Sequence, residues 1–187
     1  LSNSPAAVID SYGKEHGSSD NSLTQTATSN RHYGQCITLA SQETIYSVAF
    51  HLKKNNSPTG NVVAQIHEAN GTAFPNKLST GVVLAESDQL DVSTVSTSYE
   101  IKTFTFLNPV TLSAGDYWFG LKLLGSSVGV DAIVMNTDAS SPSHAGNVSR
   151  YRSTDGAWSA VSGEDTIFYL YGSKNIEVMT KGTDDLS

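Results

Sequence analysis

The sequence of 187 residues contains a single cysteine, Cys36. One thiol excludes an intrachain disulfide, and it also excludes a zinc site built from several cysteines. Cys36 lies in a strand-like run, residues 34–39, where a free cysteine usually serves as a small buried hydrophobic residue. No activating base is visible beside it, so the sequence does not favour a catalytic thiolate.

Charged residues are also scarce, at 16% of the chain, and the basic ones are not clustered. Eleven Lys and Arg stand against 18 Asp and Glu, which gives a net charge of −7. A nucleic-acid surface needs clustered Lys and Arg to neutralise phosphates, so we expect no nucleic-acid ligand. The polar surface must then consist largely of Ser, Thr, Asn and Gln, as on many secreted and particle-surface β proteins.

Long apolar runs are missing as well. No stretch approaches the ~18 apolar residues of a membrane-spanning helix, so we expect no membrane insertion. The chain starts at Leu1 rather than Met and shows no signal peptide, which leaves open that a targeting segment was removed. Hydrophobic residues still make up 38% of the chain, enough to build a buried core.

Sustained helical periodicity is absent, and alternation with a period of two residues takes its place. It is clearest in residues 45–52, 99–106 and 116–124, while residues 166–171 are apolar on both faces and predict a central strand covered on both sides. In residues 45–52 the alternation places Tyr46 on the same face as Val48 and places His51 outward, and in the next strand it places His67 outward. The predicted core residues are Phe104, Phe106, Phe119, Leu121, Phe168 and Leu170.

Weaker strand patterns fill the rest of the chain, and Gly- and Pro-containing turns separate them. A short helical turn is expected near residues 91–97. Together the patterns predict an all-β, antiparallel β-sandwich, jelly-roll-like, with about ten strands. We expect an N-terminal linker at residues 1–6, one domain at 7–172 and a C-terminal tail or linker at 173–187. The weaker strands are residues 7–12, 23–28, 33–39, 61–67, 82–86, 130–135 and 147–152.

Several segments in sequence order resemble β-sandwich modules of phage virion proteins and of secreted or anchored bacterial proteins, the "choice-of-anchor" type of domain. Each segment combines turns, strand starts and core aromatics. The resemblance implies a jelly-roll-like fold and a surface role that often involves glycans, and it carries over no functional residues. The segments are 57–64 (SPTGNVVA), 92–99 (VSTVSTSY), 112–118 (LSAGDYW), 156–159 (GAWS) and 165–172 (DTIFYLYG).

The candidate ligand-binding residues lie around one predicted turn near the C-terminal end. Trp158 stands beside the turn at residues 154–156, and an exposed Trp or Tyr can stack on a sugar ring. The alternative is that Trp158 packs over the core edge near Tyr169 or Tyr171. Tyr151 is a second candidate, and Arg150 and Arg152 flank it on the opposite face of the strand, where they would bind an acidic partner or remain solvated.

Catalytic and metal-binding patterns are weak. The chain has no Gly-x-Ser-x-Gly motif, and no carboxylate pair can be chosen for glycoside hydrolysis, so we expect no enzymatic activity. No histidine or cysteine spacing predicts a metal, and we expect no cofactor. A structural calcium ion bound by loop carboxylates is left open. The candidate carboxylates are Asp88, Asp91, Asp131, Asp138 and Asp165; Asp165 is also expected to fix a loop by accepting backbone N–H groups.

These observations favour a non-enzymatic, surface-exposed structural or adhesion module. The first hypothesis is a phage virion component, in capsid decoration, tail or fibre, that acts as an oligomer or assembly member among other virion or surface proteins. The alternative is a glycan-binding module of a secreted bacterial protein, and the third is a small hydrolase. The expected location is the virion surface or the extracellular space.

Overall fold

The computed structural model describes residues 6–24, 30–71, 73–125 and 130–174. All regular structure in this part of the chain is β, apart from two short 3₁₀ turns at Lys14–His16 and Val92–Thr94. The all-β prediction is confirmed, and so is the helical turn near residues 91–97, which Asp91 caps by accepting the Ser93 N–H at 2.8 Å. No helix in the described ranges is long and apolar enough to cross a membrane.

The number of strands is higher than predicted, 14 rather than about ten. The strands that the sequence patterns missed are short or polar. The strands are β1 (Ala7–Tyr12), β2 (Ser19–Leu23), β3 (Asn30–Leu39), β4 (Glu43–Asn55), β5 (Asn61–Gly71), β6 (Lys77–Glu86), β7 (Leu90–Asp91), β8 (Glu100–Leu112), β9 (Gly115–Leu124), β10 (Ala132–Asp138), β11 (Asn147–Arg152), β12 (Ala157–Val161), β13 (Asp165–Thr166) and β14 (Phe168–Lys174). The predicted strand at residues 23–28 lies mostly outside the described residues.

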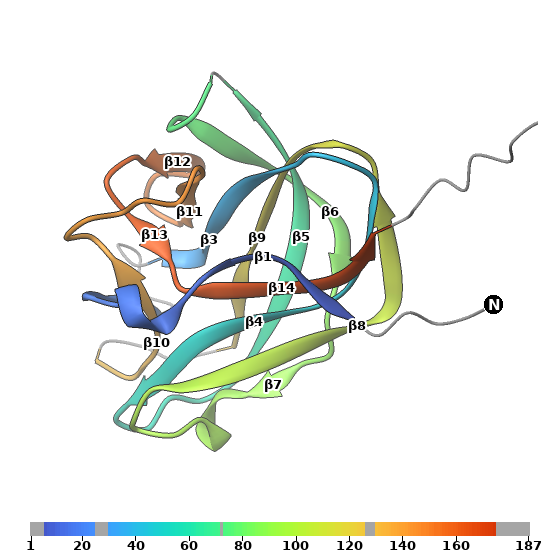
Figure 1. The fold of residues 1–187 in the computed structure, drawn as a ribbon. Coiled ribbons are helices and arrows are strands. Elements are labelled where there is room, and N and C mark those ends of the chain that lie inside the picture. Colours follow the sequence, from blue (N-terminus) through green and yellow to red (C-terminus); the bar gives the residue numbers. More distant parts are fainter. Residues whose placement is uncertain (1–5, 25–29, 72, 126–129, 175–187) are drawn as a thin grey trace, which may run out of the picture.

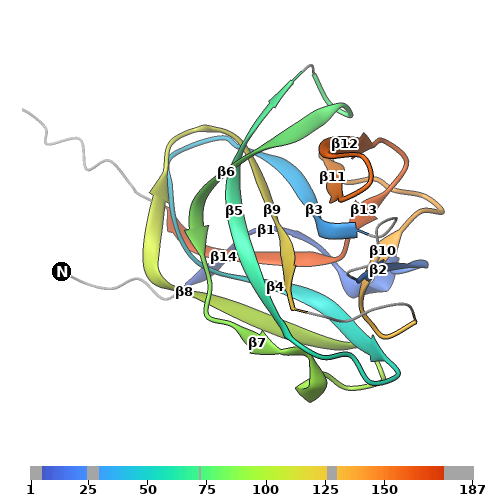
Figure 2. The same ribbon diagram turned by 180° about the vertical axis from the view of Figure 1, so that it is seen from behind.

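One hydrogen-bonded network joins all 14 strands, and nine of them follow one another in the order β1-β14-β4-β10-β2-β3-β9-β5-β6. β7 adds to β5, and β13 adds to β10. β8 adds to β4, and β11 and β12 continue outward from β3. The sheet is mixed, because the single contact of β2 with β3, at Leu23 and Asn30, is parallel. In Figure 1 the group β1, β14, β4 and β8 lies in front of β3, β9 and β5, and the view from behind in Figure 2 reverses that order.

The core lies between these two groups of strands. Phe50, Phe104 and Phe168 come from the first group, and Phe119 and Leu121 come from the second. All six residues predicted as core are buried, with exposed fractions of 3% or less. The alternation pattern therefore identified the inward face of β8, β9 and β14.

One predicted face in β4 is wrong. Ile45 is fully buried, whereas Tyr46, which the alternation placed on the same face as the buried Val48, is half-buried. The register of β4 with β8 shifts between Ile45 and Ser47, as a β-bulge requires. A bulge inserts one residue and reverses the faces on one side of it, so the pattern from Val48 onward does not extend back to Tyr46.

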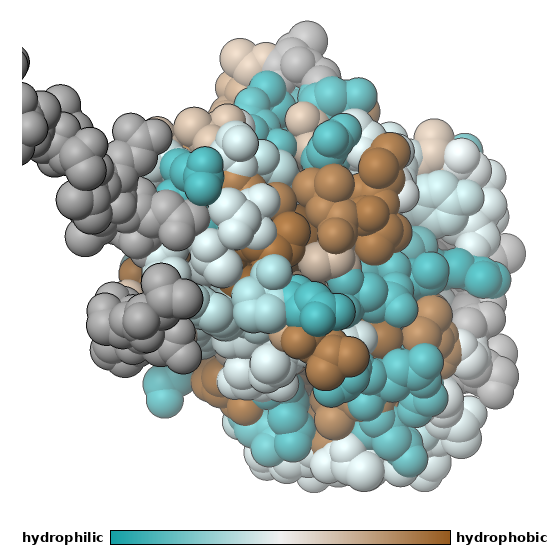
Figure 3. Space-filling view, turned by 90° about the vertical axis from the view of Figure 1, so that its right-hand side faces the viewer, coloured by the Kyte–Doolittle hydropathy of each residue, from teal (hydrophilic) through white to brown (hydrophobic). Residues whose placement is uncertain are grey.

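Two sheet edges face the solvent on the side that Figure 3 shows, where hydrophobic residues gather in separate clusters. β6 pairs along its length with β5, and β8 pairs with β4, while one isolated bridge joins Phe106 of β8 to Ser87, the residue after β6. Between them lies a groove of about 480 Å³ that contains Leu84, Leu107 and Val110. Leu107 is 77% exposed and Val82 is 54% exposed, so these edges carry apolar surface in contact with water.

Candidate functional site

The hairpin formed by β11 and β12 carries the four residues singled out in the sequence. Its turn contains Gly156, whose positive φ of 61° favours glycine, and the Gly156 N–H bonds the Arg152 carbonyl at 3.2 Å. Tyr151 pairs directly with Trp158 across the hairpin and with His32 on the neighbouring β3. Directly paired residues project from the same face, so Tyr151, Trp158 and His32 form one row.

These side chains belong to an aromatic cluster, which we define as His32, His67, Trp118, Tyr151 and Trp158. Ring centroids of Trp158 lie 5.0 Å from Trp118, 5.2 Å from His32 and 5.8 Å from Tyr151. His67 stacks on Trp118 at 4.5 Å. Trp158 therefore packs on this cluster, and the alternative partners Tyr169 and Tyr171 are not its ring neighbours.

Trp118 is the rigid base of the aromatic cluster. It is completely buried, and its Nε1–H donates to the Ser149 carbonyl at 2.9 Å. Gly120 makes room for the indole, because a Cβ there would lie 2.3 Å from Trp118 Cζ2. Trp118 lies on the strand face opposite the main core, so the aromatic cluster is a second apolar centre beneath the hairpin.

His67 is buried, with 1% exposed, which contradicts its predicted surface position. Its Nδ1 and the Ser79 Oγ lie 2.7 Å apart, and its Nε2 and the Gln65 Oε1 lie 2.9 Å apart. Because Gln65 Oε1 only accepts, Nε2 carries the proton and the Ser79 hydroxyl donates to Nδ1. Ser79 belongs to β6, which returns across this face of the sheet and covers the histidine.

Both cluster histidines are held neutral at pH 7. Burial, with a smaller contribution from the charge of Lys122, lowers the pKa of His67 to about 4. Burial also lowers the pKa of His32 to about 3, with added repulsion from Lys122, His67 and Arg31. Desolvation disfavours the charged imidazolium, so the aromatic cluster behaves as an apolar unit at neutral pH.

The outer part of the cluster remains accessible. Tyr151 and Trp158 are both half-buried. Among the described residues, the Trp158 Nε1–H has no hydrogen-bond acceptor, in contrast to Trp118. Gly81 faces this nitrogen, and a Cβ at that position would lie 3.2 Å from it. The cluster thus presents two aromatic rings and an indole N–H donor, supported from below.

Arg150 and Arg152 occupy the other face of β11. Arg150 pairs directly with Tyr33 of β3 and with Ser159 of β12, so its side chain shares a face with Tyr33. The Arg152 Nε donates to Asn30 Oδ1 at 3.2 Å. The four predicted site residues therefore form two pairs on opposite faces of one hairpin, Tyr151 with Trp158 and Arg150 with Arg152.

A separate polar network surrounds His144. Its Nε2 lies 3.2 Å from both Asp10 carboxylate oxygens, and its Nδ1 accepts the Gly146 N–H at 3.0 Å. Asp165 accepts the His144 N–H at 2.9 Å and the Gln35 amide at 2.8 Å, which confirms that it fixes a loop. No hydroxyl group of the described residues bonds a ring nitrogen of His144, so the network lacks the nucleophile contact of a hydrolytic triad.

Asp138 belongs to the same network. Burial alone would raise the pKa of its carboxyl, but hydrogen bonds from Ser141, Ser18, Ser140 and Tyr12 together hold the pKa well below the usual range. Asp165 differs, because burial outweighs its hydrogen bonds and raises its pKa. Each carboxylate is engaged by donors of neighbouring loops, which is the arrangement of a structural network.

The loop carboxylates considered for calcium do not converge. In the described ranges, no group of three or more His, Cys, Asp and Glu side chains gathers in a geometry that would hold a metal ion. Asp131 instead accepts the Ser57 N–H at 3.3 Å, and Asp91 caps the turn that follows β7.

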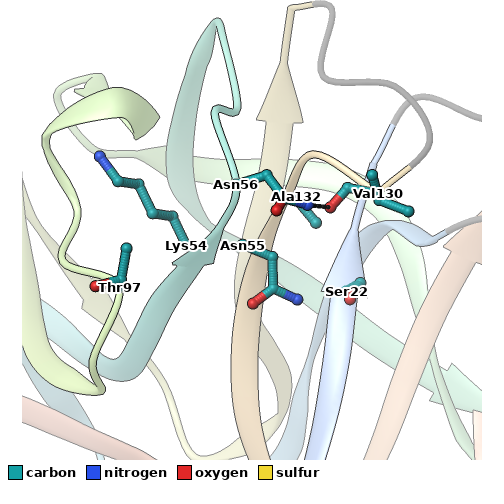
Figure 4. Close-up of a pocket in the computed structure, with 7 residues that line it drawn as sticks. All are labelled: Ser22, Lys54, Asn55, Asn56, Thr97, Val130 and Ala132. Carbon is teal, nitrogen blue, oxygen red and sulfur yellow. Dashed lines mark hydrogen bonds between the residues drawn. The ribbon is translucent and has the colours of Figure 1, made fainter.

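A surface hollow of about 640 Å³ is drawn in Figure 4, and none of its lining residues belongs to the aromatic cluster. It is lined mainly by polar side chains of β4 and its neighbours, and the Asn56 Nδ2 donates to the Val130 carbonyl across it at 3.0 Å. Lys54 bonds the Ser93 carbonyl. None of the residues that line the hollow is aromatic, so we consider the aromatic cluster the stronger candidate. The lining residues are Ser22, Lys54, Asn55, Asn56, Thr97, Val130 and Ala132.

No protein-family model matches the chain, and a search of curated proteins finds no similar sequence. The candidate site therefore stands on its geometry. Sequence reasoning found Tyr151 and Trp158 but missed His32, His67 and Trp118. One signal in the sequence could have revealed Trp118. Trp118 and Gly120 share the face of β9 opposite the core, and a large ring next to a glycine on that face indicates that other residues cover it.

Proposed function

We propose that the chain is a non-catalytic adhesion domain that binds glycans at the surface formed by Tyr151 and Trp158. One observation supports this most strongly: the two half-buried rings lie side by side, with centroids 5.8 Å apart, over the fully buried Trp118. Sugars stack on aromatic faces and bond to nearby donors, and the Trp158 Nε1–H supplies such a donor. A preformed surface of this kind loses little side-chain entropy on binding.

The fold and setting that we propose are those of a jelly-roll-like sandwich at a virion surface or outside the cell, where the domain acts in several copies. The sequence segments that resemble virion and anchored modules support this proposal. The exposed apolar side chains on β6 and β8 support it as well, because large exposed apolar areas are typical of contact surfaces. Repetition strengthens weak single-site binding, as an adhesion role needs.

Glycan binding is tested with Trp158→Ala and Tyr151→Ala on a glycan array, using the chain displayed in many copies. We expect each variant to lower the signal at least tenfold, because stacking and the indole donor are lost together. Tyr171→Ala is the matched control, since Tyr171 is also half-buried but lies on β14. Thermal melting of each variant separates a binding loss from a folding defect. Equal signals for Trp158→Ala and Tyr171→Ala would refute the site.

Assembly is tested by light scattering. We expect the chain to form oligomers through the apolar edges of β6 and β8, with a second copy as the partner. Leu107→Asp is expected to shift the chain to monomers, because it places a charge on a side chain that is 77% exposed. Val8→Asp, at a position 53% exposed on β1, is the control and is expected to leave the mass unchanged. A monomeric wild-type chain at high concentration would contradict the proposal.

A further inference from the structure

A further surface hollow, of about 360 Å³, lies between the hairpin of β5 with β6 and the start of β9. This hairpin projects at the top of the molecule in Figure 1. Glu68 and Asn70 line the hollow from β5, Thr80 lines it from β6, and Tyr117 lines it from β9. None of the lining residues belongs to the aromatic cluster, so the hollow is separate from the stacking surface of Tyr151 and Trp158.

The hollow lies where β6 bulges away from its regular pairing with β5. Between two regular pairs of these strands, Glu68 alone stands against residues 80–82. Gly81 has a positive φ of 78°, which favours glycine, and its N–H donates to the Ser79 Oγ at 3.0 Å. The Thr80 Oγ1 accepts the N–H two residues further on at 3.1 Å. A bulge bends its strand and interrupts the pairing, so space remains beside Glu68.

Tyr117 forms the aromatic wall of the hollow. It pairs directly with Glu68, so both side chains project from the same face of the sheet. Its hydroxyl donates to the Ser113 carbonyl at 3.1 Å, and its ring lies along Gly115, where a Cβ would be 3.6 Å from the ring Cε2. These contacts hold the ring in place while it remains half-buried. Tyr117 therefore offers an ordered ring surface to a ligand.

Polar groups with unused hydrogen-bonding capacity surround this ring. Within the part of the chain that the structure describes, no hydrogen bond or ion pair engages the side chain of Glu68 or of Asn70. The Thr80 hydroxyl accepts one bond and keeps its own proton for donation. A carboxylate, an amide and a hydroxyl beside one ring suit a ligand whose groups both donate and accept, as sugar hydroxyls do.

The charges in the hollow favour a neutral ligand. Asp116 also lines it, but the Lys77 Nζ lies 2.7 Å from its carboxylate and the Thr38 hydroxyl donates to it at 2.5 Å. Glu68 has no such counter-charge among the described residues, so its carboxylate repels anions. A metal ion needs more ligands, and no group of three or more His, Cys, Asp and Glu in the described ranges would hold one. The two oxygens of a carboxylate accept readily from two neighbouring hydroxyl groups.

We propose that this hollow is a second sugar subsite, in which Glu68 accepts hydrogen bonds from two neighbouring hydroxyls of a neutral hexose and the Tyr117 ring packs on the sugar. The subsite rests on the glycan-binding role proposed above and extends its ligand. The bulge in β6 borders both surfaces, because Gly81 faces the Trp158 Nε1 whereas Thr80 lines the hollow. We therefore expect an oligosaccharide, rather than a single sugar, as the ligand of the whole surface.

The subsite is tested by amide NMR titration of the full chain with methyl β-D-glucoside, methyl α-D-mannoside and methyl β-D-galactoside, which differ in the arrangement of neighbouring hydroxyls. We expect at least one of them to shift the amide signals of Ala69, Thr80 and Tyr117 in a saturable way. Glu68→Gln is expected to weaken this binding about fivefold or more, because a charged acceptor is replaced by a neutral amide. Asp88→Asn is the control, since Asp88 is exposed and lies outside the hollow.

The same spectra separate this proposal from the stacking surface, because the indole N–H of Trp158 gives its own signal. Saturable shifts of that signal alone, with none at the three amides, would support the stacking surface and overturn the second subsite. Unchanged affinity in Glu68→Gln would overturn it as well. Calcium chloride and ethylammonium chloride are titrated in parallel, and larger shifts of the three amides with either cation would identify a cation site instead. Because Glu68 is exposed, Glu68→Gln is expected to melt at the wild-type temperature, so a binding loss is not a folding defect.

Discussion

Phe168→Ala is expected to lower the free energy of unfolding by about 3–5 kcal/mol, the range for removing a buried aromatic ring. Phe168 is completely buried in β14, which is hydrogen-bonded on both sides. It pairs with Tyr12 of β1 and with Phe50 of β4, and its ring lies 5.3 Å from that of His144. Because neighbours on both sides are held by sheet hydrogen bonds, they cannot move in to fill the space, and a cavity remains.

Urea unfolding at pH 7 measures this effect, with the slope of the transition showing whether unfolding stays two-state. Val82→Ala is the control, because Val82 is 54% exposed, and it is expected to change stability by less than about 0.5–1 kcal/mol. If Phe168→Ala unfolded at the same urea concentration as the wild-type chain, the assignment of β14 as a buried strand would be wrong.

Alternation predicted the parts of the fold in which one strand face meets the core. The bounds of β1 and β11 match the predicted residues 7–12 and 147–152, and the six predicted core residues are buried. For residues 166–171 the prediction was partly right: Phe168 and Leu170 are buried, but Tyr169 and Tyr171 on the other face are half-buried. A run of aromatic residues does not show whether another strand covers a face of the sheet or whether that face is left partly open to solvent.

The wrong predictions for Tyr46 and His67 have one physical cause, since each depends on how a second strand lies against the first. A bulge in β4 reverses the faces of Ile45 and Tyr46, and no residue type in the run signals it. His67 is buried because β6 returns across its face and places Ser79 on the imidazole. Alternation assigns a residue to a face, but it does not tell which face another strand covers.

The candidate site was predictable only in part for the same reason. Tyr151 and Trp158 flank a turn at residues 154–156, so the pairing of the two rings could be inferred from the hairpin pattern. The pairing of β11 with β3 joins segments far apart in the chain, and it is this pairing that brings His32 beside Tyr151 and Tyr33 beside Arg150. The aromatic cluster is not visible until that register is known.

Acid is expected to destabilise the protein well above the range in which carboxylates titrate, because of the two cluster histidines. In the unfolded chain a histidine binds a proton near pH 6.5, but in the folded chain the pKa is about 4 for His67 and about 3 for His32. Between these values the unfolded state binds more protons, so stability falls as pH falls from 6.5. Each histidine contributes about 1.4 kcal/mol per pH unit, which amounts to roughly 4 kcal/mol for the pair at pH 5.

Urea unfolding at pH 7.0, 6.0, 5.0 and 4.5 tests this, since carboxyls with lowered pKa such as Asp138 titrate below that window. Glutamine at both positions is neutral throughout, so His32→Gln with His67→Gln is expected to lower stability at pH 7 but to remove most of the slope between pH 6.5 and 4.5. His16→Gln is the control, because the His16 side chain is 43% exposed, and it should leave the slope unchanged. A slope that persisted in the double variant would assign the acid sensitivity to other groups. A wild-type chain equally stable at pH 7.0 and 4.5 would show that water reaches both imidazoles and that the aromatic cluster is open in solution.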